Sequence, residues 1–305
     1  MEWTPGGTSQ DIEDRRDESG GGGYGGGGGV GFGGGGFGGM HLGIGGTIVV
    51  LLLSLFFPRL AGILSLFTGG GGGGMPSGSY NTSAPAVPNR ARDAQEGTEV
   101  QFMSFVLDDV QKNWDRVLPQ QTGIAYRHAK LVLFRDAFPS GCGTADTATG
   151  PFYCPADQKV YLDLGFFNEL QTRFGAPGQF AQAYVVAHEI GHHVQKLTGI
   201  EERIHQMQEQ NPRQANQLSV QLELQADCLA GVWGNSTEQR KIVDNADVEA
   251  GLNAAAAVGD DRLQRQAQGY VNPEKFTHGS SAQRTAAFKK GLDSGQVSAC
   301  GVTAR

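Results

Sequence analysis

The sequence predicts an α+β fold, mainly helical with a small sheet, that follows a glycine-rich arm and one membrane helix. Three observations predict it: the uneven distribution of glycine, an apolar run near residue 50, and helical and strand-like periodicity after residue 98. Most of the 48 glycines precede residue 80. Glycine-rich segments lose much backbone entropy on ordering and carry little apolar surface to offset the loss. We therefore expect a disordered arm at 1–41, an anchor at 42–67, a flexible linker at 68–97 and a folded domain at 98–305.

The anchor is predicted from an apolar run at Leu42–Phe57, followed by Pro58, Arg59 and a second run at Leu60–Phe67. A spanning helix needs about 20 apolar residues, and Arg59 can reach the interface from near its end. A cleaved signal peptide is the alternative, but the run follows a long acidic, glycine-rich arm rather than a short basic segment. A buried core helix would need partner elements that glycine-rich flanks do not supply. We expect a single-pass anchor in the cell (inner) membrane.

The four cysteines all follow this anchor, at Cys142, Cys154, Cys228 and Cys300. Their even number and the short loop between the first two predict Cys142–Cys154 and Cys228–Cys300 disulfides in an oxidising compartment. A zinc site built from these cysteines is the alternative, but the CxxC spacing of such sites is missing. We therefore expect the folded domain on the outer, periplasmic side.

The folded region is predicted to open with a helix that starts at the capping box of Thr98 and is ended by Pro119 and Gly123. Strands are predicted at Lys130–Phe134 and Gln158–Leu164, which are rich in β-branched and large apolar residues. The second strand alternates apolar and polar residues, which favours a place near the sheet edge, where an extended peptide could add on. Further helices are predicted at Gln179–Leu197, Gln214–Trp233, Asp247–Gln268 and Ser281–Leu292.

The charge of the chain argues against a nucleic-acid-binding protein. The formal net charge is −7, and the arginines and lysines of the folded region are scattered singly, without a basic patch. We expect no nucleic-acid partner, and we assign the acidic balance to solubility.

Residues 188–192 read His-Glu-Ile-Gly-His, an HExxH motif within an otherwise almost wholly apolar helix. Side chains four residues apart lie one helical turn above each other, so His188 and His192 can reach one Zn²⁺ ion. Glu189 points to the neighbouring sector and can take a proton from a water whose pKa zinc lowers. A structural alternative, in which both histidines hydrogen-bond within the core, needs partners for these buried polar groups.

A catalytic zinc site needs a third protein ligand. No histidine follows at the metzincin spacing, and His205 stands in polar sequence. The better candidate is Glu223 on the second predicted buried helix, with Asp227 one turn later. Asp227 could accept the second N–H of a ligand histidine and fix its orientation. The alternative for both carboxylates is a solvated helix face.

Four segments together resemble the bacterial family of membrane-anchored neutral zinc metallopeptidases: HEIGHHVQ, ELQADCLAGVW, the GCG…GPFYCP…VYLDL stretch and THGSSAQR. The similarity covers residues 95–305 and extends to the glycine-rich, apolar N-terminal part. The resemblance implies a zincin-like metallopeptidase fold.

The motifs are similar, more distantly, to gluzincins of the membrane CaaX-protease and heat-shock peptidase group. Proteins of that group carry an HExxH motif, then a Glu followed four residues later by an Asp, and then a His followed six residues later by an Arg. In this chain the Glu and Asp positions hold Glu223 and Asp227, and the His and Arg positions hold His278 and Arg284. The resemblance implies that Glu223 is the third ligand, that His278 donates to the oxyanion of the tetrahedral intermediate, and that Arg284 pairs with Asp227. That group has Pro after the His, whereas this chain has Gly279, so we expect His278 to be held less firmly. That group also has several spanning segments, so cleavage within the membrane is not expected here.

The sequence therefore favours a membrane-anchored, zinc-dependent endopeptidase with a protein or peptide substrate and one membrane helix. A non-catalytic zinc-containing envelope binding protein and a zinc amidase acting on the cell wall are the alternatives. Glu189 discriminates against the first of these, because a purely structural site gains nothing from an unligated carboxylate at the metal. The sequence carries no signal of the oligomeric state.

Overall fold

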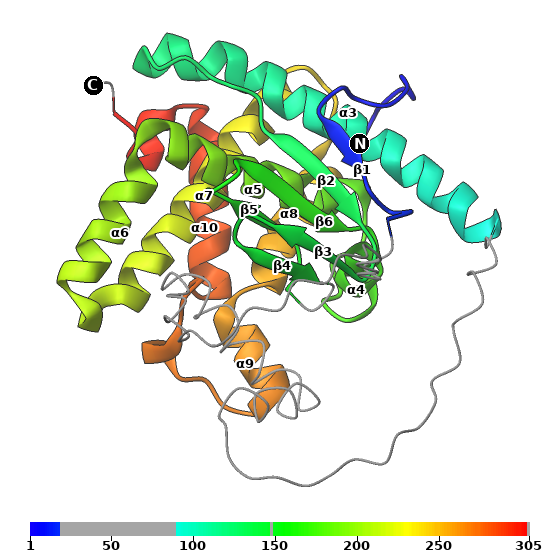
Figure 1. Cartoon of the computed structure of the whole chain (residues 1–305). Coiled ribbons are helices and arrows are strands. Elements are labelled where there is room, and N and C mark those ends of the chain that lie inside the picture. Colours follow the sequence, from blue (N-terminus) through cyan, green and yellow to red (C-terminus); the bar gives the residue numbers. More distant parts are fainter. Residues whose placement is uncertain (19–89, 147–148, 304–305) are drawn as a thin grey trace, which may run out of the picture. The chain divides into compact units, whose positions relative to one another are not determined.

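The computed structural model describes residues 1–18, 90–146 and 149–303 (Figure 1). One compact unit comprises Met1–Ser19 together with Thr98–Arg305, and it holds both sheets and the candidate site. The predicted anchor at 42–67 and most of the predicted linker lie outside the described residues. Among the helices that are described, none combines the length and the apolar character that crossing a membrane requires.

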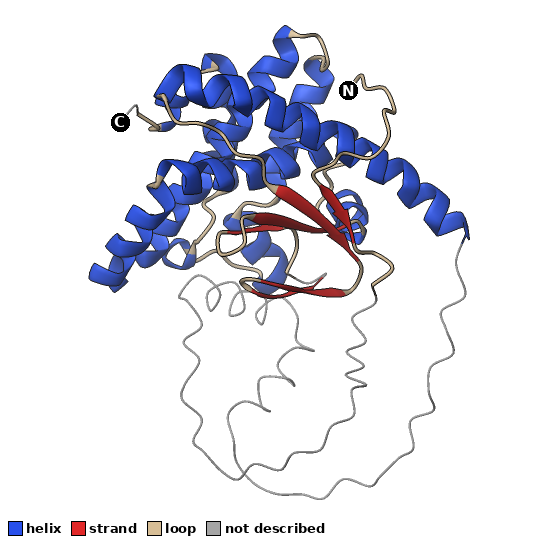
Figure 2. Ribbon diagram, turned by 45° about the horizontal axis from the view of Figure 1, so that its top comes forward, coloured by secondary structure: helices blue, strands red, loops and turns tan. Residues whose placement is uncertain are grey.

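The described elements are mostly helical, with short strands concentrated before the central helix (Figure 2). The strands are β1 (Ile12–Asp14), β2 (Lys130–Phe134), β3 (Ala137–Ser140), β4 (Gly143–Asp146), β5 (Phe152–Cys154) and β6 (Lys159–Asp163). The helices are α3 (Arg90–Thr122), α4 (Gly165–Thr172), α5 (Gln179–Thr198), α6 (Ile200–Gln210), α7 (Ala215–Gln239), α8 (Asn245–Ala257), α9 (Asp260–Gln268) and α10 (Ser281–Ser294). The predicted α+β class, mainly helical with a small sheet, agrees with this arrangement.

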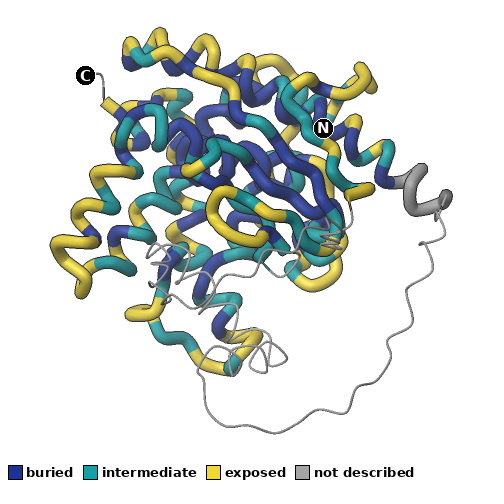
Figure 3. The backbone as a smooth tube through the Cα atoms, in the orientation of Figure 1, coloured by how far each residue is buried: buried dark blue, intermediate teal, exposed yellow. Residues whose placement is uncertain are grey.

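The main sheet has the order β1-β2-β6-β5, in which only β5 runs antiparallel to its neighbour. Strand β6 is therefore an interior strand, and the prediction that Gln158–Leu164 lies near the edge is wrong. The alternating polar residues of this strand suggested that one of its faces is exposed to solvent, but that face is also covered. Tyr161 packs there with Val132 and Cys154 in a small cluster under the β3–β4 hairpin. Both faces of β2 and β6 are thus buried, as Figure 3 shows.

The first 18 residues belong to the fold, and the prediction that they form part of a disordered arm is wrong. Strand β1 pairs in parallel with β2, and Leu131 N–H donates to Asp11 O while Arg15 N–H donates to Leu133 O, both at 2.8 Å. The glycine runs begin only at residue 20, so this segment keeps side chains that can pack. Trp3, for example, contacts Phe102, with ring centroids 5.3 Å apart.

Two helix boundaries differ from the prediction. Helix α3 starts at Arg90 rather than Thr98 and includes Pro119, whose missing N–H removes one bond of the hydrogen-bond ladder in the last turn before the helix ends. The predicted helix Asp247–Gln268 is divided at Gly259 into α8 and α9. A Cβ at Gly259 would lie 2.3 Å from Ser281 N, so the chain turns where another backbone segment passes.

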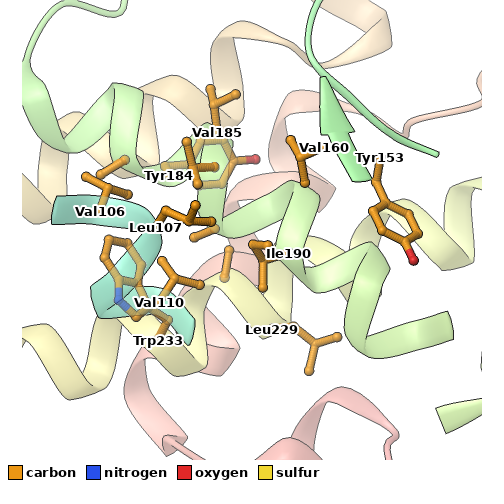
Figure 4. Close-up of a cluster of buried hydrophobic side chains, with 14 of the residues drawn as sticks. Val106, Leu107, Val110, Tyr153, Val160, Tyr184, Val185, Ile190, Leu229 and Trp233 are labelled. Carbon is orange, nitrogen blue, oxygen red and sulfur yellow. The ribbon is translucent and has the colours of Figure 1, made fainter. Parts of the chain in front are cut away.

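The core is built around α5, whose apolar side chains face the sheet, α3 and α7. Figure 4 shows Ile190 at its centre, with Val160 from β6, Val110 from α3 and Leu229 from α7 around it. Burying these side chains contributes roughly 1.5–3 kcal/mol each. Because α5 carries the HExxH motif, the same packing that stabilises the domain holds the motif rigidly.

Both predicted disulfides are present. Cys142–Cys154 joins the β3–β4 hairpin to β5, and Cys228–Cys300 joins α7 to the C-terminal segment. Helices α7 and α10 approach so closely that a Cβ at Gly231 would lie 2.0 Å from Phe288 O. The second disulfide therefore reinforces a tight helix pair.

Candidate metal centre

The candidate site lies where α5 meets α7. Gly191, inside the HExxH motif, makes this approach possible, because a Cβ there would lie 2.9 Å from Ala226 O. The glycine brings one turn of α5 against the turn of α7 that carries Glu223 and Asp227.

His188, His192 and Glu223 form a group whose ligand atoms all lie within 4.8 Å of one another. His188 Nε2 is 3.2 Å from Glu223 Oε2, and His192 Nε2 is 3.5 Å from Glu223 Oε1. Ligands about 2.0–2.1 Å from a tetrahedral zinc ion would be separated by about 3.4 Å. The donor set and its spacing therefore fit Zn²⁺.

The second ring nitrogen of His188 is held by a buried network. His188 Nδ1 is 2.8 Å from Asp227 Oδ1, and Arg284 donates from Nε to Asp227 Oδ2 at 2.9 Å. Tyr184 OH also donates to Asp227. Since a carboxylate only accepts, Nδ1 of His188 donates to Asp227, and Nε2, which faces Glu223, is the nitrogen left to bind a metal.

His192 is oriented by a different partner, Gln195, which is fully buried. Its Oε1 lies 2.8 Å from His192 Nδ1, and its Nε2 donates to Leu222 O at 2.7 Å and to Gln225 Oε1 at 3.0 Å. With its amide fixed by α7, Gln195 presents an acceptor to His192, so this histidine also keeps Nε2 for a metal.

The carboxylates of the site differ in their ionisation. Burial acts to raise the pKa of Glu223, but the charges of His192 and His278 and a hydrogen bond with His188 hold this pKa well below its usual range. Burial raises the pKa of Glu189 above its usual value, against the attraction of His188 and His192. The lowered pKa of Glu223 keeps its carboxylate ionised, as a metal ligand must be. The raised pKa of Glu189 means that its carboxylate binds a proton more readily, as a general base must.

The buried Asp227 is ionised as well. Burial acts to raise its pKa, but Arg284 and His188 lower it to about 2. In turn, burial acts to lower the pKa of His188, but Asp227 and Glu223 raise it to about 10.

Glu189 is buried beside a feature that the sequence did not reveal, Tyr153 on β5. A backbone hydrogen bond from Tyr153 reaches the Glu189 carboxylate, and Tyr153 OH lies 2.9 Å from His193 Nδ1. His193 Nε2 in turn lies 2.6 Å from Arg127 O. The edge strand β5 and the HExxH helix are thus joined at the carboxylate.

His278 lies near the group, close enough for Glu223 to influence its pKa. Its Nδ1 is 3.1 Å from Asp260 Oδ1, while Asp260 Oδ2 accepts the backbone N–H groups of Thr277, His278 and Gly279 at 2.7, 2.7 and 3.0 Å. Gly279 has φ of +94°, which proline cannot adopt, and it donates an N–H that proline lacks. The expectation that Gly279 leaves His278 loosely held is therefore wrong, because Asp260 fixes this loop.

The structure brings together every metal-site residue that the sequence singled out: Glu189, the three ligand candidates, Asp227, Arg284 and His278. It adds Gln195, Tyr184, Tyr153 and Asp260. Gln195 and Tyr184 stand three residues after His192 and four before His188, so helical spacing could have indicated them. Asp260 and Tyr153 reach the site from other elements, so no local sequence pattern could have predicted that they lie there.

The HExxH helix, a glutamate on a second helix and an arginine–aspartate pair behind the first histidine together form a candidate zinc site, which points to the class of zinc metallopeptidases. The chain belongs to the family described as "Putative neutral zinc metallopeptidase", whose model matches residues 1–303.

Relatives of the chain occur in Escherichia coli and in mycobacteria. The chain is 43% identical over 305 residues to the protein YpfJ of Escherichia coli (strain K12), with 98% of each chain covered. It is 42% identical over 198 residues to Rv2575 of Mycobacterium tuberculosis (strain H37Rv) and to Mb2605 of Mycobacterium bovis, covering 61% of this chain and 64% of theirs. The names of these relatives assign no activity. No solved structure matches the chain at a significant level.

Proposed function

We propose that the protein is a membrane-associated zinc endopeptidase of the cell envelope, in which Glu189 is the general base. The observation that supports this most directly is a buried, unligated carboxylate beside a complete set of three ligand side chains. A structural zinc site has no use for such a group, whereas peptide hydrolysis requires it.

In the proposed reaction, bound zinc supplies Lewis acidity that polarises a peptide carbonyl and lowers the pKa of water. Glu189 accepts the proton of the attacking water and delivers it to the leaving amine. His278, fixed by Asp260, donates a hydrogen bond to the developing oxyanion. Arg284 and Asp227 keep His188 in the tautomer and orientation of a ligand.

The substrate is proposed to bind as an extended peptide along β5. In the described part of the sheet, β5 pairs with β6 alone, so no described strand pairs with its other edge. Because Tyr153 in the middle of β5 hydrogen-bonds Glu189 through its backbone, a peptide added to this edge would pass the catalytic carboxylate. The apolar run at 42–67 supports membrane association, and the two disulfides support a location on the outer side.

The test compares the purified full-length wild type with Glu189→Gln, both in detergent. Bound zinc is quantified, and cleavage of an unfolded protein is followed with and without a chelator. We expect one zinc per chain in both proteins and a loss of about 10²–10⁴-fold in cleavage rate for the variant. Glu223→Gln is the matched variant that should lose the metal as well as the activity.

Three results would contradict the proposal. Zinc-free wild type would remove the site, and equal activity of wild type and Glu189→Gln would remove the assigned base. Zinc in both proteins with cleavage only of cell-wall amides would favour an amidase.

A further inference from the structure

The N-terminal segment Met1–Glu18 is joined to the domain by backbone hydrogen bonds over its length. Besides the β1–β2 pairing, Glu2 N–H donates to Ile242 O at 2.7 Å, next to the C-terminal end of α7. The segment therefore follows the domain from the end of α7 to the β2 side of the sheet, where β1 adds an edge strand.

Charged side chains of this segment also bind polar and charged side chains of the domain. Asp11 receives hydrogen bonds from Gln111 on α3 at 2.9 Å and from Lys130 on β2 at 2.7 Å. Glu13 binds Lys159 of β6 through both oxygens at 2.9 Å. These contacts involve three separate elements of the domain, so they specify the place and the register of β1.

Apolar contacts complete the match. Trp3 packs on Phe102 and Phe105 of α3, with ring centroids 5.3 and 6.2 Å apart, and Ile12 packs against the main core cluster. Without this segment, the edge of β2 and the aromatic surface of α3 would be open to water. Residues 1–18 are thus an integral part of the peptidase domain.

The apolar run at 42–67 stands between these two parts of one domain in the sequence. If it crossed the membrane once, about 30 Å of hydrocarbon would separate residues 1–18 from residues 98–305. Strand β1 could then not pair with β2. We propose that residues 1–18 and 98–305 lie on the same side of the membrane.

The composition of the intervening sequence is compatible with this topology. Between Glu18 and Arg90, the only charged side chain is Arg59. Burial of charge in lipid costs several kcal/mol per residue, so this composition carries few such costs whichever side of the membrane the two flanking parts occupy. This arrangement differs from the single-pass anchor that the hydrophobic run alone predicts.

Cysteine labelling in the full-length protein tests the proposal. Asp17→Cys places a thiol at a fully exposed position beyond β1, and Lys289→Cys places one on an exposed position of α10. The native cysteines are all in disulfides, so the wild type measures the background. Each variant is treated with a membrane-impermeant maleimide in intact cells and after permeabilisation.

We expect the two thiols to behave alike, so that permeabilisation changes the labelling of both by less than about twofold or raises both together. Labelling of one thiol in intact cells with labelling of the other only after permeabilisation would overturn the proposal. Detergent-solubilised protein, in which both thiols should react, controls for local access. The result does not depend on peptidase activity, so it stands apart from the test of the proposed function.

Discussion

Two regions of the molecule combine the same residue types with different consequences. At the metal centre, His188, Asp227 and Arg284 form a buried network, with side-chain exposures of 8%, 0% and 4%. At the base of β1, His128 and Asp11 are joined by Lys130, and the His128 side chain is 41% exposed. The comparison teaches that burial, rather than composition, decides how much a histidine–carboxylate–cation cluster contributes to stability.

The largest expected difference concerns the carboxylates. Asp227→Asn should lower the free energy of unfolding by about 3–5 kcal/mol, because it leaves the buried Arg284 charge without its partner. Asp11→Asn should cost about 1 kcal/mol or less, because water and salt screen its exposed partners. Urea unfolding of the zinc-free full-length proteins measures both values.

A matched double variant sharpens this prediction. Removing the arginine charge as well, in Asp227→Asn/Arg284→Gln, should restore part of the lost stability. Equal costs for Asp227→Asn and Asp11→Asn would show that burial does not distinguish the two clusters.

The partner of the second ligand histidine is expected to act on metal affinity. Gln195→Leu should weaken zinc binding by about 10–100-fold, because His192 loses the acceptor that orients its ring. Competition with a chromophoric chelator measures the affinity. Gln208→Leu, which removes a buried glutamine bound to Ser219 rather than to a ligand, is the control and should leave the affinity unchanged; equal losses would indicate a general packing effect.

Zinc binding should release a proton at pH 7. The folded-state pKa of His188 is raised to about 10 by Asp227 and Glu223, against the effect of burial, so the metal-free protein carries a proton that the metal must displace. Calorimetry in buffers with different heats of ionisation measures about one proton per zinc. No release at pH 7 would contradict the protonated state.

The raised pKa of His188 also determines how the stability of the metal-free protein changes with pH. The stabilisation from protonated His188 is full below the unfolded pKa of about 6.5 and is lost as the pH rises through about 10.

The smallest expected effect is at His128. Burial acts to lower its pKa, but Asp115 and Asp11 raise it. Its stabilisation is therefore full below about pH 6.5 and lost as the pH rises through the raised folded-state pKa. His128→Ala should cost a few tenths of a kcal/mol at pH 6 and less in alkaline solution, as thermal unfolding at the two pH values would show. A cost that grows in alkaline solution would reverse the assigned sign.

Much of the site was predictable because it depends on helical spacing. His188 and His192 lie on one face of α5, and Glu223 and Asp227 on one face of α7, so local periodicity placed each pair correctly. The strand at Lys130–Phe134 was predicted correctly from its β-branched and large apolar residues. The place of β6 inside the sheet was missed, because its polar positions are covered by a hairpin whose packing no local pattern records.

By itself, the sequence determined the α+β class, the two disulfide pairs, the HExxH helix and the three candidate zinc ligands. The helices and the candidate ligands depend on residue types at short, regular spacings, which fix which side chains share a face. The disulfide pairs follow instead from the even number of cysteines and the short loop between the first two. Only the tertiary structure decided that Asp260 holds His278, that Gln195 is fixed by α7 and that residues 1–18 supply a strand. Contacts such as that of Asp11 with His128, 117 residues apart, form only when separate elements pack together. Local sequence patterns do not predict them, because the free energy of packing depends on the whole fold.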